Sequence, residues 1–141
     1  MIGINSKMIF VLSLIFVAMC NADATNKIGT APQRLRPPAG LKCSRDHLTS
    51  FQGRILAYKH GKKNLSLRVR TDEKTTETFT LKWEAPDKAE KWFLLRGEEF
   101  KAEDWKLIES APGKLIVGTR IIVWVCDDGS KPVFDWRPKE G

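Results

Sequence analysis

Residues 65–70 alternate between apolar and polar side chains, and this alternation constrains the fold of the chain more than any other feature. Leu65, Leu67 and Val69 fall on one face of an extended strand, and the polar residues between and after them fall on the other. A helix would scatter these residues around its axis. The segment is therefore predicted to be a β-strand with one buried face.

Two further segments with strand character flank this one. Residues 54–59 precede a turn that contains Gly61, and residues 78–83 follow the polar stretch 71–76. Because the connections are short, the simplest arrangement is a meander of three antiparallel strands.

The second half of the chain predicts a helix and two more strands. Residues 101–109 have the spacing of a two-turn helix that ends before Pro112 and Gly113, while residues 119–126 and 132–136 favour strands. The predicted fold class is mainly β: a five-stranded OB-like barrel with one short helix between the third and fourth strands.

Several turn and core positions between residues 53 and 136 resemble those of small exported domains with an OB-like barrel. The resemblance rests on a Gly53-x-Ile55 opening, on the apolar alternation described above, and on an entry into the fourth strand that runs from Leu115 through Gly118 to Val123. It implies a fold rather than an activity.

An apolar run at residues 8–19 follows Lys7 and leads to the small-residue tripeptide 22–24. The run is about 12 residues long, whereas a membrane-spanning helix needs roughly 20. Residues 1–24 are therefore predicted to be a signal peptide, which makes the protein periplasmic or secreted and leaves no membrane span after cleavage. A retained anchor and lipidation at Cys20 are the alternatives.

Three prolines stand in residues 25–40, at Pro32, Pro37 and Pro38, and they favour an extended arm. The OB-like barrel domain is then expected to cover residues 41–141.

Two cysteines, Cys43 and Cys126, remain after the expected cleavage. An even number of cysteines in an exported chain predicts one disulfide. Cys43 and His47 also form a C-x3-H pair, but no second ligand pair accompanies it, so neither a metal nor another cofactor is predicted.

The formal net charge is +7, and the excess lies in the first half of the chain. Residues 25–82 carry 13 Lys and Arg against 4 Asp and Glu, whereas residues 83–141 carry 10 against 12. This asymmetry indicates an anionic partner for one side of the fold, with ordinary solubility as the alternative.

Basic and aromatic residues around the first hairpin are the candidate ligand contacts: Tyr58, Lys59, Lys62, Lys63, Arg68, Arg70 and Trp124. Proteins that bind single-stranded nucleic acid place cationic side chains along its phosphate backbone and aromatic rings against its bases. The same two types of side chain suit charged glycans. The apolar strand 121–125, with Trp124, favours instead a protein partner that adds a strand or fills a groove.

No catalytic arrangement is evident. His47 and His60 lack a nucleophile motif, and the acidic residues between 98 and 104 are expected to form a solvated face. The leading hypothesis is an exported, non-enzymatic binding module associated with a protein or the envelope. The alternative is a binder of an anionic polymer, either single-stranded nucleic acid or charged glycan.

Overall fold

The computed structural model describes residues 35–140. Within this range the protein is mainly β with one short α-helix, as the sequence predicts. The expected signal peptide, residues 1–24, and the arm as far as residue 34 lie outside the described residues. No helix in residues 35–140 has the length and apolar character needed to cross a membrane.

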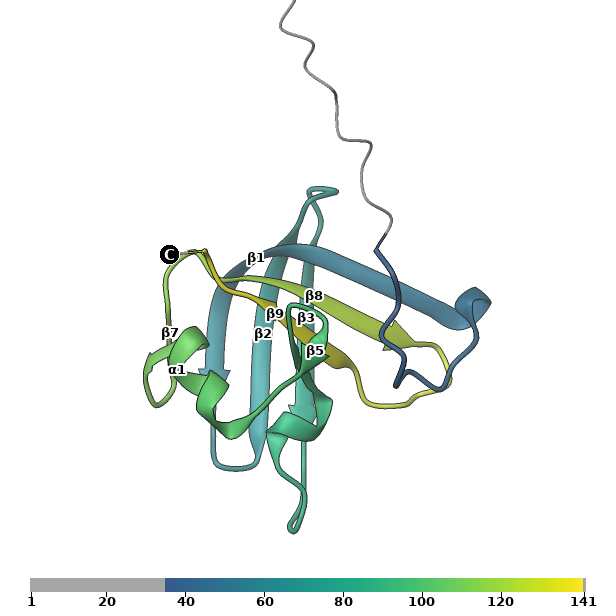
Figure 1. Cartoon of the computed structure of the whole chain (residues 1–141). Helices are drawn as coiled ribbons and strands as arrows, with labels where there is room; N and C mark the ends of the chain where they lie inside the picture. Colours follow the sequence, from purple (N-terminus) through teal and green to yellow (C-terminus); the bar gives the residue numbers. More distant parts are fainter. Residues whose placement is uncertain (1–34, 141) are drawn as a thin grey trace, which may run out of the picture. The chain divides into compact units, whose positions relative to one another are not determined.

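The main sheet has seven strands in the order β3-β2-β1-β8-β9-β4-β5 (Figure 1). Neighbouring strands are antiparallel except β4 and β9, which run parallel. The sheet is not closed, so the predicted five-stranded barrel is not confirmed. The strands are β1 (Leu48–His60), β2 (Asn64–Thr71), β3 (Thr76–Lys82), β4 (Phe93–Leu95), β5 (Glu98–Glu99), β8 (Arg120–Cys126) and β9 (Val133–Arg137).

The helix expected over residues 101–109 is shorter in the structure. A 3-10 turn, η3 (Ala102–Asp104), leads into α1 (Trp105–Ile108), and the chain then pairs as a small hairpin. Glu109 is extended because it belongs to that hairpin, which consists of β6 (Glu109–Ala111) and β7 (Lys114–Leu115). Two more 3-10 turns, η1 (Arg45–His47) and η2 (Ala89–Trp92), precede β1 and β4.

Strand β1 pairs with two different strands along its length. It pairs with β8 from Leu48 to Arg54 and with β2 from Gly53 to His60, so Gly53 and Arg54 have partners on both sides. A Cβ atom on Gly53 would overlap the backbone oxygen of Arg70. The close approach of β2 at this point therefore requires glycine.

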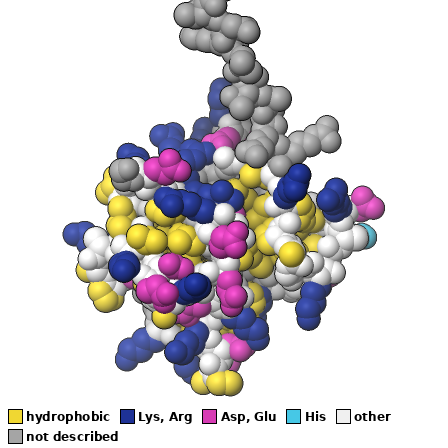
Figure 2. Space-filling view, in the orientation of Figure 1, with side chains coloured by type: hydrophobic (Ala, Val, Ile, Leu, Met, Phe, Trp, Pro, Cys, Tyr) yellow, Lys and Arg dark blue, Asp and Glu magenta, His cyan; other side chains and the backbone are white. Residues whose placement is uncertain are grey.

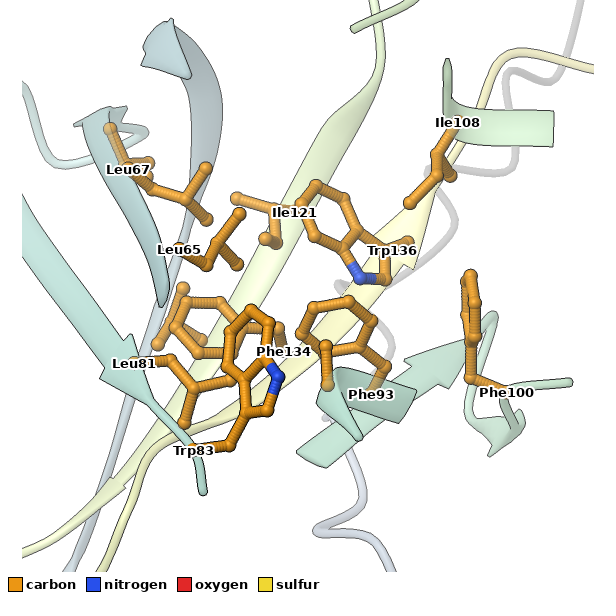
Figure 3. Packing of buried hydrophobic residues seen from close by; sticks show 13 residues of the cluster. Leu65, Leu67, Leu81, Trp83, Phe93, Phe100, Ile108, Ile121, Phe134 and Trp136 are labelled. Carbon is orange, nitrogen blue, oxygen red and sulfur yellow. The ribbon is translucent and has the colours of Figure 1, made fainter. Parts of the chain in front are cut away.

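The core lies on the inner face of the sheet, as predicted from the alternation in residues 65–70. The inward side chains of β2 are fully buried, and Phe93 packs edge-on against Trp136 with ring centroids 5.4 Å apart (Figure 3). Trp83 is also in this core, while Trp92 and Trp105 pack against it.

The predicted disulfide joins Cys43 to Cys126, which are 83 residues apart in the sequence. It ties the segment before β1 to the end of β8. Beside it, Nδ1 of His47 lies 2.8 Å from a carboxylate oxygen of Asp127. This hydrogen bond, and then the charge of Asp127, raises the pKa of His47 above its ordinary value.

Candidate anion-binding face

The outer face of β1, β2 and β3 carries three of the basic residues that the sequence singled out. Arg68 pairs with Ala57 on one side and Thr78 on the other, and Lys59 pairs with Ser66. Because the alternate residues of β2 are buried in the core, Arg68 and Arg70 must point outward, and both are exposed. The structure therefore brings Lys59, Arg68 and Arg70 to one surface.

The register adds a row of four arginines that crosses four neighbouring strands. Arg70 of β2 pairs with Arg54 of β1, Arg54 pairs with Arg120 of β8, and Arg120 pairs with Arg137 of β9. Side chains directly opposite each other across a ladder lie on the same face, about 5 Å apart at Cβ. We call these four residues the arginine row.

The carboxylates beside the arginine row neutralise only half of it. Asp72 accepts hydrogen bonds from Arg120 at 2.6 and 2.7 Å, and Asp135 accepts one from Arg137 at 2.6 Å. Within residues 35–140, Arg54 and Arg70 form no ion pair. Like charges held opposite each other repel, so an added anion would be attracted to this place.

Small hydroxyl groups accompany the cations. Three of the outward residues of β3 are threonines, and Oγ1 of one of them, Thr76, lies 3.4 Å from the guanidinium of Arg70. Hydroxyl groups can donate to or accept from the polar groups of a ligand. The outward small polar residues of this face are Ser66, Thr76, Thr78 and Thr80.

Aromatic side chains are missing from this face within residues 35–140. All but one of the described Phe, Tyr and Trp side chains lie in the core or pack against it. The exception, Trp124, is only 4% exposed, in a strand that pairs with β1 on one side and with β9 on the other. The reason for expecting Trp124 in a surface site therefore does not hold.

Lys62 and Lys63 lie in the turn between β1 and β2, at one end of the outer face that carries Lys59, Arg68 and Arg70. Both are exposed, and Nζ of Lys63 lies 3.2 Å from Glu84. An exposed ion pair of this kind contributes little to stability and leaves the lysine accessible to a ligand.

Tyr58, which was expected among the ligand contacts, points to the other side of β1. Its hydroxyl donates to Oε1 of Glu109, and Nδ1 of His60 lies 2.7 Å from the same oxygen. The second carboxylate oxygen accepts from the backbone N–H of Gly113 at 3.1 Å. Burial, and then the bond and charge of Glu109, raise the pKa of Tyr58 well above its ordinary value.

This cluster continues through stacked rings. His60 stacks on Trp105 with centroids 4.6 Å apart, and Nε1 of Trp105 donates to Glu90 at 2.6 Å. Three donors occupy both oxygens of Glu109, whose side chain is 8% exposed. The arrangement fixes the α1–β6–β7 segment to β1, and we interpret it as a structural clamp.

Sequence reasoning missed three members of the arginine row and the clamp. Arg54, Arg120 and Arg137 belong to three different strands, and only the pairing register shows that they form one row with Arg70. Within residues 35–140, no group of three or more His, Cys, Asp and Glu side chains is placed to hold a metal ion.

The chain matches no family model, no curated protein and no solved structure.

Proposed function

We propose that the protein is an exported, non-enzymatic binding module that holds an anionic glycan on the outer face of its sheet. The observation that carries this proposal is the arginine row, in which two arginines lack a carboxylate partner among the described residues. A guanidinium group offers a planar set of donors that fits sulfate and carboxylate groups in a bidentate way.

A polymer suits the row better than a single small anion. Neighbouring strands are about 4.8 Å apart, so four arginines on four strands span roughly 14 Å. A chain with regularly spaced charges that runs across the strands would meet one arginine per strand. Lys59 and Arg68 extend the same surface along β1 and β2.

A glycan suits the face better than single-stranded nucleic acid. Base stacking on aromatic rings supplies about 1–3 kcal/mol per base in single-strand binding, and this face offers no exposed ring within residues 35–140. Hydroxyl-bearing side chains next to cations match the hydroxyl and acid groups of a charged sugar.

A protein partner at strand 121–125 has less support. Strand β8 is paired on both sides, with β1 and with β9, so it has no free edge for an added strand. The double pairing of β1 supports an OB-like barrel that stays open beside β3. Export to the periplasm or the exterior is supported by the disulfide.

The proposal is tested by comparing ligands at one ionic strength. Heparin oligosaccharides of defined length, single-stranded DNA of matched charge, and neutral dextran are each titrated into the purified protein by calorimetry. We expect heparin to bind at least about tenfold more tightly than DNA, a difference of about 1.4 kcal/mol, and dextran not to bind. Tighter binding of DNA than of heparin, or binding of neither, would contradict the proposal.

A further inference from the structure

A groove of about 620 Å³ opens beside β1 where β8 stops pairing with it. The pairing with β8 ends at Arg54, whereas β1 continues to His60. One wall of the groove is therefore residues 54–58 of β1, and the other is formed by Leu115 and the segment 117–120. A volume of this size is typical of small-molecule sites.

Two exposed apolar side chains are among the residues that line this groove. Val117 is 91% exposed and Leu56 is 52% exposed, and both line it. Leu56 is turned outward because β1 shifts register between Ile55 and Ala57. Only two other large apolar residues in 35–140, Leu35 and Leu107, are exposed in this way. Two of the four therefore share one site, as expected of a surface that buries an apolar ligand.

Three cations lie on the border of the same groove: Arg54, Arg120 and Lys139. Arg120 forms an ion pair with Asp72, but Arg54 and Lys139 form no ion pair within the described residues. The side chain of Lys139 lies against Gly118, whose φ is +88° and where a Cβ atom would overlap it. In Figure 2, apolar side chains border Lys and Arg side chains over the region where β7 and the C-terminus lie in Figure 1.

We propose that this groove binds a single-chain amphiphile with an anionic head. The acyl chain lies on Leu56 and Val117, and the carboxylate or phosphate head lies between Arg54 and Lys139. This groove shares Arg54 and Arg120 with the arginine row, but Leu56, Val117 and Lys139 belong to no part of the outer face proposed to hold the glycan.

The test follows the methyl NMR signals of Leu56 and Val117 in the purified protein. Monomeric laurate and dodecyl phosphate are added below their micelle concentrations, beside acetate, inorganic phosphate and dodecyl maltoside. The proposal expects saturable shifts of both residues with the two anionic amphiphiles, and at least about tenfold weaker binding of the head groups alone and of the neutral maltoside. Equal binding of the maltoside, or binding only to phosphatidylglycerol vesicles, would overturn it.

Variants separate this site from the glycan face. Val117→Asp is expected to weaken laurate binding at least about tenfold, and Lys139→Gln about threefold or more. Leu107→Asp is the matched control, since Leu107 is exposed outside the groove. Arg68→Gln should weaken heparin binding and leave laurate binding unchanged. Laurate affinity that is equal in Val117→Asp and Leu107→Asp would also overturn the proposal.

Discussion

Arg54 lies directly opposite Arg120 in the β1–β8 ladder, and on its other side it lies opposite Arg70. This arrangement follows from the double pairing of β1, which gives Gly53 and Arg54 a partner on both sides. Two pairs of like charges thus share one central residue. The sheet keeps a repulsive arrangement, which in the proposed function a bound anion would relieve.

Replacing the central arginine should stabilise the protein. Arg54→Thr removes the like-charge contact with Arg70 and a weaker one with Arg120, whose charge Asp72 offsets, and it places a β-branched residue in a strand. We therefore expect the free energy of unfolding to rise by about 0.2–1 kcal/mol at low salt. Urea unfolding measures this gain, which should shrink at high salt because salt screens the repulsion. Lys106→Thr, at an exposed position on α1, should show no such gain.

Gly53→Ala should destabilise the protein. The new Cβ atom would overlap the backbone oxygen of Arg70, so β2 must move away from β1, at a cost of about 1–3 kcal/mol. Gly40→Ala is the control, because a Cβ there meets no atom within 4 Å. Thermal unfolding compares the two variants. Equal stability of both would show that the close approach of β2 at Gly53 is not required.

Removal of the disulfide should cost several kcal/mol. Cys43 and Cys126 close a loop with a sequence separation of 83, for which the chain-entropy relation gives roughly 4.5 kcal/mol. The double variant Cys43→Ser/Cys126→Ser is unfolded in urea beside the oxidised protein. A loss below about 1 kcal/mol would indicate that the unfolded chain is already restricted in this region.

Tyr58 is the only tyrosine in the chain, so its ionisation can be followed by the absorbance of tyrosinate. We expect the pKa to lie well above 10 in the folded protein, because of burial and then Glu109, and to return to about 10 in urea. Glu109→Gln should lower the folded value.

The raised pKa of Tyr58 makes the stability of the folded protein depend on pH. The folded state holds the phenol proton more tightly than the unfolded state, so stability should fall as the pH rises above about 10. Tyr58→Phe should remove this part of the pH dependence. A folded protein whose tyrosine titrates near 10 would contradict the clamp at Glu109.

The sequence predicted the mainly β character, the buried face of β2 and the disulfide, because each depends on local alternation or on counting cysteines. It also predicted that Arg68 and Arg70 point to one side, since they alternate within one strand. It did not predict the seven-stranded open sheet. Strands β4 and β5 are only three and two residues long, too short to give a periodic pattern.

The arginine row and the clamp depend on long-range pairing. Arg54 and Arg120 are 66 positions apart, and Tyr58 and Glu109 are 51 apart, so no spacing rule brings them together. The apolar character of residues 121–125 is compatible with a strand covered on both faces or with an exposed patch, and the structure shows a central strand in which Trp124 is buried. Register between distant strands is therefore what the sequence alone does not provide here.

The salt dependence of heparin binding tests the central proposal most directly. The affinity of the purified protein and of Arg54→Gln/Arg70→Gln is measured by calorimetry between about 50 and 200 mM salt, with Lys88→Gln/Lys106→Gln as the control of equal charge. We predict that the wild-type affinity falls steeply with salt, and that the arginine variant loses at least about tenfold in affinity and roughly two units of the slope of log affinity against log salt. Equal losses in the arginine and lysine variants would contradict the account, because net charge rather than the arginine row would then attract the glycan.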